Sequence, residues 1–257
     1  VVEVPVSSDD AEQENDAMDA LDDDDLDAGW EGAPDDQNIL TTGLRFQNVT
    51  VPNGTVIEEA YIEVVSHEAK TAEDVAIITL VGEAADNAET YTLDALITDR
   101  PETNAKVVWT VDEEWGLWTT HQTADISSII QEIVNRPGWK AGNALAIMLK
   151  GSDEQGPSDM ENAREIEAFE NISDPEDGGD GKRHPERVPK LIIRYNQVSS
   201  VEETITGHEL LSVYPNPAHG KINIEFNELG EAGIFIYNNS GELVMQKRTA
   251  PSKTVEL

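Results

Sequence analysis

The chain has 257 residues with 52 acidic and 17 basic side chains, which gives a formal net charge of −35. Nucleic acids and anionic membranes attract Lys and Arg, so both are excluded as preferred partners. The absence of cysteine excludes disulfides, thiolate catalysis and cysteine-based metal sites, and no apolar run approaches the roughly 20 residues of a transmembrane helix.

The chain opens with an acidic segment. Between Val1 and Asn38 there are 15 Asp and Glu residues and no Lys or Arg. Such a run is typical of a disordered tail, because its charges repel one another and its apolar groups are few. Here the segment contains Leu21, Leu26 and Trp30 and leads directly into a strand-like run at residues 42–46. We therefore expect its carboxylates to bind a hard cation at the edge of a β-sandwich.

The middle of the chain is rich in short β-strand patterns. β-Branched and aromatic residues with partial alternation predict strands, and Pro52–Thr55 has strong turn chemistry between the first two of them. The expected strands span residues 43–51, 56–65, 74–83, 106–111, 143–151, 163–170 and 190–195, and residues 91–99 are expected to be irregular.

One segment has helical periodicity. Ile126, Ile129, Ile130, Ile133 and Val134 fall on one face of a helix. Thr123 or Asp125 can cap its start, and residues 135–138 end it with Pro and Gly. Many short strands, one short helix and no βαβ rhythm predict an all-β, jelly-roll-like β-sandwich over residues 1–195. A polar linker is expected at 196–210, followed by a smaller β unit over 211–257.

The smaller unit carries a recognisable motif. It contains Tyr214, Pro215, Asn216 and Pro217, then Gly220, and later the hairpin pattern of residues 236–244. This arrangement resembles the C-terminal type A sorting domain of type IX secretion cargo from Bacteroidota. The resemblance implies a secreted or cell-surface protein that is handled by the type IX secretion machinery. Such domains continue for further strands, so the domain is expected to be incomplete here, and the Val1 start suits removal of a signal peptide.

The larger unit is also similar to a known type of module. The similarity rests on Ser8–Glu12, Gly43–Phe46, Ile57–Ile62, Trp139–Ala144 and Pro189–Tyr195. These segments resemble a secreted β-sandwich module found in large surface proteins of marine and environmental bacteria. The resemblance implies a binding or structural role rather than catalysis.

Three acidic clusters are candidates for calcium, which takes six to eight oxygen ligands from flexible segments. The alternation of Asp23, Asp25 and Asp27 is like the start of an EF-hand loop, but Ala28 and Pro34 stand where that loop needs Gly and Glu. The alternative interpretation is solvated surface charge. The predicted ligands are Asp9, Asp10 and Glu12, then Asp23, Asp25 and Asp27, and finally Asp174, Asp177 and Asp180 with Glu176 beside them.

The aromatic residues allow two interpretations. Trp109, Trp115, Trp118 and His121 can form a platform for sugar stacking, but core packing is the more common role of such residues. Trp30 lies in an acidic segment that we expect to be exposed. Trp30 and Trp118 are therefore the predicted ligand-stacking residues.

No catalytic motif stands out. The five histidines show no metalloprotease spacing, and a carboxylate pair chosen among 52 acids carries no information. The sequence therefore predicts a calcium-stabilised, non-catalytic module that acts in adhesion or as a structural subunit of an extracellular assembly, with itself or surface glycans as partners. A carbohydrate-binding module is the alternative, and a polysaccharide lyase or hydrolase is a third hypothesis.

Overall fold

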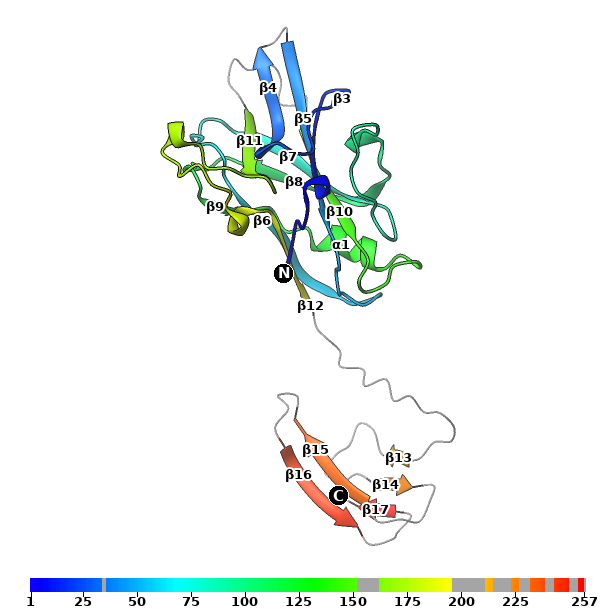
Figure 1. Ribbon diagram of the computed structural model, residues 1–257. Coiled ribbons are helices and arrows are strands. Elements are labelled where there is room, and N and C mark those ends of the chain that lie inside the picture. The colour runs from blue at the N-terminus through cyan, green and yellow to red at the C-terminus, as the bar shows by residue number, and fades with distance from the viewer. Residues whose placement is uncertain are drawn as a thin grey trace. The chain divides into compact units, whose positions relative to one another are not determined.

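The computed structural model describes residues 1–33, 36–151, 162–195, 211–214, 223–226, 232–238, 243–249 and 254–256. It divides into two compact units, Val1–Val198 and Ser199–Leu257, which are described separately (Figure 1). The boundary falls inside the segment predicted as a linker, residues 196–210, which lies outside the described residues.

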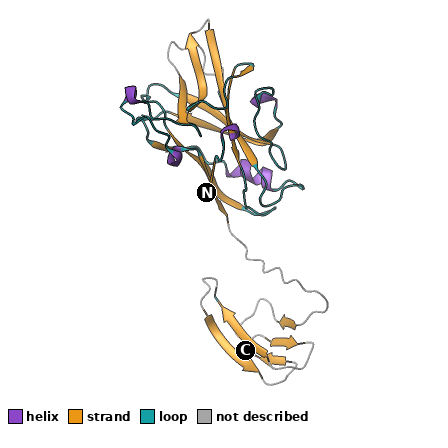
Figure 2. Cartoon of the chain, in the orientation of Figure 1, coloured by secondary structure: helices purple, strands orange, loops and turns teal. Residues whose placement is uncertain are grey.

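The larger unit consists almost entirely of strands and loops (Figure 2). Its strands are β1 (Val2–Glu3), β2 (Asp10–Glu14), β3 (Ala17–Met18), β4 (Asp25–Ala33), β5 (Asp36–Phe46), β6 (Ile57–Val65), β7 (Ala76–Glu83), β8 (Glu102–Val111), β9 (Thr120–Gln122), β10 (Leu145–Lys150), β11 (Asn162–Glu167) and β12 (Lys190–Tyr195). The helices are α1 (Ser127–Val134) and the short 3₁₀ turns η1 (Ser7–Asp9), η2 (Ile97–Asp99), η4 (Pro175–Asp177) and η5 (Pro185–Arg187).

The strands form two sheets. One has four strands in the order β1-β12-β6-β9, and the other has the order β11-β4-β5-β10-β7-β8. Strand β2 adds to β5 in the second sheet and pairs with β3. The pairs of β5 with β4, β10 and β2 are all antiparallel. The predicted all-β sandwich with one short helix is therefore confirmed.

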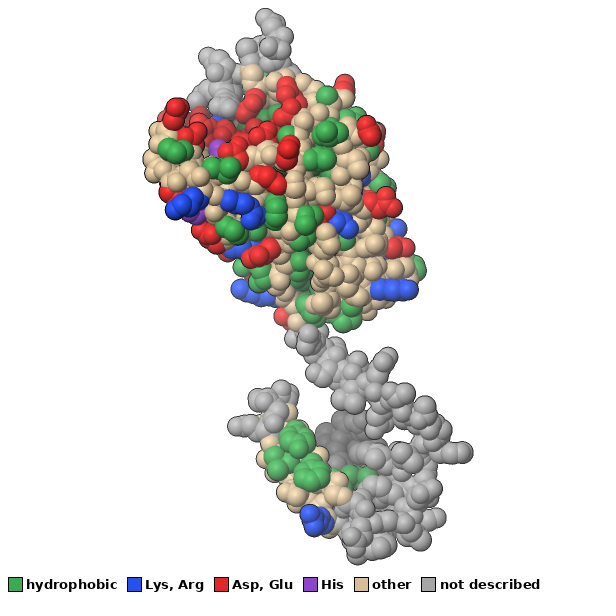
Figure 3. All heavy atoms as spheres, viewed as in Figure 1, with side chains coloured by type: hydrophobic (Ala, Val, Ile, Leu, Met, Phe, Trp, Pro, Cys, Tyr) green, Lys and Arg blue, Asp and Glu red, His purple; other side chains and the backbone are tan. Residues whose placement is uncertain are grey.

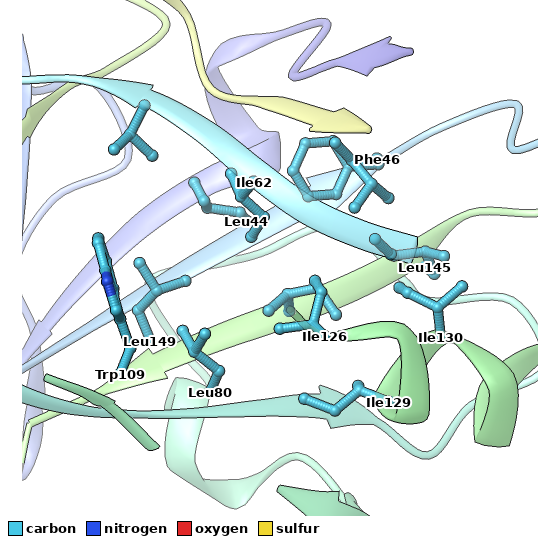
Figure 4. Packing of buried hydrophobic residues seen from close by; sticks show 14 of the residues in the cluster. Leu44, Phe46, Ile62, Leu80, Trp109, Ile126, Ile129, Ile130, Leu145 and Leu149 are labelled. Atoms are coloured by element: carbon cyan, nitrogen blue, oxygen red, sulfur yellow. The ribbon is translucent and has the colours of Figure 1, made fainter. Parts of the chain in front are cut away.

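The core lies between the sheets and is closed by α1. Apolar side chains from β5, β6, β7, β8 and β10 meet those of the helix there (Figure 4). The residues labelled in that view are Leu44, Phe46, Ile62, Leu80, Trp109, Ile126, Ile129, Ile130, Leu145 and Leu149. All of them are buried, with the rings and branched side chains filling the space between the two sheets.

The helix forms where the periodicity predicts it. Ile129, Ile130, Ile133 and Val134 are fully buried, and α1 contacts β6, β7 and β8. Asp125 stabilises its start, since the Ser127 amide donates a hydrogen bond of 2.8 Å to Asp125 Oδ1. An acidic oxygen at this end satisfies a free backbone amide and interacts well with the helix dipole.

The acidic segment differs from the loops that we expected. Residues 25–33 and 36–46 form the long strands β4 and β5, and Asp10–Glu14 forms β2. Asp and Glu are rare in strands, but here alternate residues are apolar and buried: Leu26 and Ala28 are 3% and 1% exposed. Tertiary burial of one face outweighs the low strand propensity of the other.

The smaller unit is also all-β. Its described strands are β13 (Leu211–Tyr214), β14 (Asn223–Phe226), β15 (Ala232–Tyr237), β16 (Leu243–Thr249) and β17 (Thr254–Glu256). They form a three-stranded sheet, β13-β14-β17, and a two-stranded sheet, β15-β16. Ile224 and Ile234 are buried together. Tyr214 ends β13, whereas the other motif residues, Pro215, Asn216, Pro217 and Gly220, lie outside the described residues.

Candidate metal centre

Strands β2, β4 and β11 bring acidic residues together at one end of the larger sheet. Strand β5 pairs with β4 through residues 36–40 and with β2 through residues 40–44, and β11 pairs with the other edge of β4. Acidic side chains gather in the region of β4 and β11, with a histidine among them (Figures 1 and 3). The pairing therefore collects carboxylates from segments that are far apart in the sequence.

The register of β4 and β11 brings three carboxylates from the two strands together. Asp27 lies opposite Glu165, and Asp25 lies two residues earlier, on the same face of β4. Ligand oxygens of Asp25, Asp27 and Glu165 all lie within 4.8 Å of one another. Two oxygens that bind one calcium ion at about 2.4 Å are at most about 4.8 Å apart. The three carboxylates are therefore close enough to share an ion.

Glu12 of β2 lies beside this group. Its Oε2 accepts a 2.6 Å hydrogen bond from the backbone amide of Asp27. Glu12 is only 8% exposed. The Asp27 Oδ1 atom is buried and has no hydrogen-bond partner among the described residues. A buried acceptor without a donor is costly, and a cation is one group that would satisfy it.

Burial and mutual repulsion make the ionised group costly without a cation. Burial, followed by the charges of Glu12 and Glu165, raises the pKa of Asp27 to about 10. Burial also raises the pKa of Glu12 to about 8, although the Asp27 amide lowers it in part. The pKa values of Asp25 and Glu165 are raised as well, in both cases chiefly by burial. A bound divalent ion would reverse these shifts.

Lys70 supplies part of the compensating charge. Its Nζ lies 3.0 Å from Glu165 Oε1 and also contacts Glu68. The Lys70 ammonium therefore forms ion pairs with Glu165 and Glu68 at one side of the acidic cluster. Asp25 and Asp27 have no ion pair with Lys or Arg among the interactions that the described residues show.

Three of the predicted ligands lie together in the structure, and Glu165, which was not predicted, lies with them. Asp25, Asp27 and Glu12 lie together, whereas Asp23 is exposed and accepts only the 3.3 Å hydrogen bond of the Asp24 amide among its described contacts. Glu165 was missed by sequence reasoning. Its segment was expected to be a strand, but the sequence carries no sign that this strand pairs with β4.

Asp9 is occupied by other side chains. Its carboxylate accepts hydrogen bonds from Arg45 Nη1 at 2.5 Å and from Gln47 Nε2 at 2.6 Å, and it is fully buried. This ion pair anchors η1 to β5. The geometry thus gives Asp9 a packing role rather than the ligand role that we predicted.

Asp10 is also buried, and among the described residues no Lys or Arg pairs with it. Its Oδ2 accepts a 2.7 Å hydrogen bond from the Phe169 amide. Burial raises the pKa of Asp10 to about 8, and the Phe169 amide lowers it in part. Asp10 belongs to none of the groups of three close donors found among the described residues.

Asp10→Asn is expected to stabilise the protein by up to about 5 kcal/mol at pH 8, because the amide keeps an acceptor for Phe169 and removes a buried acid. The folded pKa lies above the unfolded value, so the gain is small near pH 4 and complete above pH 8. Urea unfolding at both pH values measures it. Asp9→Asn is the matched control and is expected to destabilise, since it breaks the pair with Arg45. A loss in Asp10→Asn that is equal at both pH values would contradict the account.

In the third predicted cluster, Asp174 and Asp180 stabilise the turns of a surface loop. Asp174 accepts a 2.7 Å hydrogen bond from the Glu176 amide, and Asp180 accepts one of 3.0 Å from the Lys182 amide. His184 Nε2 lies 3.1 Å from Asp180 and holds the pKa of that carboxyl below its usual range. The side chain of Asp177 is outside the described part of the structure. Asp174 and Asp180 join no group of three close donors among the described residues.

The aromatic residues require a correction. Trp30 lies on β4 and is 1% exposed, so its ring has no face for a sugar. Trp109 and Trp115 are buried in the core with their ring centroids 6.0 Å apart, which agrees with the core-packing interpretation. Trp118 is partly exposed, and the Arg187 guanidinium lies over its ring at 4.7 Å. Trp30 is therefore not a ligand-stacking residue, and Trp118 keeps only a ring that Arg187 partly covers.

Two comparisons with known proteins bear on identity. No curated protein matches the chain. Residues 212–257 match the family model of the secretion system C-terminal sorting domain. In the described part of the structure, no helix has the length and apolar character needed to cross a membrane. The chain therefore carries a secretion system C-terminal sorting domain and is a type IX secretion cargo protein, secreted or displayed at the cell surface.

Proposed function

We propose that the larger unit is a non-catalytic surface module that binds structural calcium and acts in adhesion or as a structural subunit of an extracellular assembly. The observation that carries the calcium assignment is the convergence of Asp25, Asp27 and Glu165 within 4.8 Å of one another. The unpartnered Oδ1 of Asp27 supports it.

The donor chemistry favours calcium over other ions. The group offers carboxylate oxygens, and further ligand positions can be filled by backbone carbonyls or water. Magnesium demands a near-ideal octahedron at about 2.0–2.1 Å, whereas calcium accepts irregular sets of oxygens. A secreted or surface protein can use a site of modest affinity, since extracellular calcium modules bind at about 10⁻⁴–10⁻³ M.

The ion would stabilise the fold by linking two strands. Asp25 and Asp27 lie on β4, and Glu165 lies on β11, which is the edge strand of the larger sheet. A shared calcium would fix the register of this edge and offset the repulsion between the carboxylates. Because the unfolded chain has no preformed site, binding free energy would add to folding stability.

Calcium is expected to raise the melting temperature. At 100 times the dissociation constant, a ligand that binds only the folded state adds about 2.7 kcal/mol, or about 5–10 °C for a unit of this size. Differential scanning calorimetry with EDTA and with excess calcium measures the shift, and magnesium at equal concentration controls for ionic strength. Equal melting temperatures in EDTA and calcium would remove the proposed site.

The non-catalytic role is proposed because the sequence shows no recognisable catalytic motif and resembles secreted surface modules. A structural subunit is expected to self-associate in calcium, which light scattering coupled to size exclusion measures directly. An adhesive module is expected to stay monomeric and to bind a surface coated with host or bacterial glycans or proteins. The burial of Trp30 weakens the carbohydrate-binding alternative.

A further inference from the structure

A histidine lies against the same acidic group. His67 follows β6, and its backbone amide donates a 2.9 Å hydrogen bond to the carbonyl of Glu165 on β11. This bond holds the histidine beside the strand that supplies Glu165. A ring nitrogen of His67 and carboxylate oxygens of Asp24 and Asp25 all lie within 4.8 Å of one another. None of these contacts was anticipated from the sequence, because His67, Asp24 and Glu165 come from separate segments.

A buried carboxylate lies directly behind this histidine. Glu167 is fully buried, and its Oε1 is 3.4 Å from His67 Nδ1. Its Oε2 is 3.7 Å from Arg187 Nη1. Neither oxygen has a hydrogen-bond partner among the described residues. A histidine that binds a metal through Nε2 commonly has such a carboxylate at Nδ1, where the carboxylate orients the ring and increases its basicity.

We infer that Asp24, Asp25 and His67 form a second cation position, which takes a borderline transition ion such as Zn²⁺ and shares Asp25 with the calcium position. The imidazole nitrogen distinguishes the two positions, because Zn²⁺ binds nitrogen well whereas calcium prefers oxygen alone. Zn²⁺ at about 2.1 Å from each donor needs them within about 4.2 Å of one another, so the three side chains would have to close slightly around the ion. Glu167 acts as the positioning residue for His67. This inference rests on the proposed calcium site only through the shared Asp25.

Zn²⁺ binding to the full chain in saturating calcium tests the inference. Isothermal titration is expected to show one site, and His67→Gln and Asp24→Asn are each expected to weaken it at least about tenfold. Glu167→Gln is expected to weaken Zn²⁺ about 10–100-fold while calcium still raises its melting temperature by as much as in the wild type, which separates positioning of His67 from a general loss of folding. Co²⁺ in place of Zn²⁺ is expected to give visible absorption bands that disappear in His67→Gln.

His184→Gln is the matched control, since His184 also contacts two carboxylates, at Asp180 and Glu186. It is expected to leave the Zn²⁺ affinity unchanged. Equal Zn²⁺ affinity in wild type and His67→Gln would overturn the second position and leave His67 as the counter-ion of Glu167. Asp27→Asn separates the two sites, because it is expected to abolish the calcium effect and to keep Zn²⁺ binding. Zn²⁺ binding through His67 without any calcium effect would refute the calcium site and sustain this one.

Discussion

Asp27→Asn is expected to make the calcium-free protein more stable at pH 8 and to remove its stabilisation by calcium. In the wild type, the pKa of Asp27 is raised to about 10 and that of Glu12 to about 8. Above the unfolded values near 4, the folded chain therefore binds more protons than the unfolded chain. Stability is lost as the pH rises toward the folded pKa values.

The size of this effect follows from proton linkage. One extra proton on the folded chain changes the free energy of unfolding by about 1.4 kcal/mol per pH unit. Between pH 5 and pH 8, Asp27 alone can therefore lower the stability of the calcium-free wild type by up to about 4 kcal/mol. The variant is expected to lose the part of this pH dependence that Asp27 carries and to keep the part that Asp10 carries. Saturating calcium is expected to flatten the wild-type curve, because the ion binds the deprotonated carboxylates.

Urea unfolding at pH 5 and pH 8, in EDTA and in calcium, measures both effects. Asp23→Asn is the matched control, since it removes one acidic charge from the same segment at an exposed position. It is expected to keep both the pH dependence and the response to calcium. If the two variants behave alike, the effect comes from general charge repulsion and not from a site at Asp27.

Gly29→Ala is expected to destabilise the protein by about 3 kcal/mol or more and to weaken calcium binding at least about tenfold. Gly29 has a φ of 134°, a conformation that side chains rarely adopt. A Cβ atom there would lie 2.4 Å from the Asn162 carbonyl oxygen and 2.7 Å from Ala163 Cα. Relief of this clash must move β11 away from β4, and Glu165 moves with it.

Chemical denaturation and calcium titration of the variant test this expectation. Gly54→Ala is the control, because Gly54 also has a positive φ of 72° but has no atom within 4 Å of the added Cβ. It is expected to cost about 1 kcal/mol from backbone strain alone and to bind calcium normally. A Gly29→Ala protein that binds calcium like the wild type would show that close contact between β4 and β11 is unnecessary.

Sequence patterns predict much of the fold for local reasons. The spacing of Ile126, Ile129 and Ile130 locates α1, and the apolar run within residues 74–83 locates β7, which spans Ala76–Glu83. Strand boundaries are less accurate, since β5 begins at Asp36 rather than at residue 43. In β4 the alternation of Asp25, Leu26, Asp27 and Ala28 is itself a strand signal. We nevertheless expected a loop there, because Asp has a low intrinsic propensity for strands.

The site is harder to predict than the fold. Asp25 and Asp27 are two residues apart, so their shared face follows from strand geometry. Glu12, Glu165 and His67 reach them through pairings with β5, β4 and β11 that no local pattern specifies. Trp30 shows the opposite error, because its acidic neighbours suggested exposure although alternate residues of β4 face the core.

A crystal structure of the protein grown in calcium, with anomalous scattering data, tests the calcium site directly. A calcium peak is expected about 2.3–2.6 Å from oxygens of Asp25, Asp27 and Glu165. A well-ordered acidic group that holds only water and the Lys70 ammonium, with no anomalous peak among the three carboxylates, would contradict it.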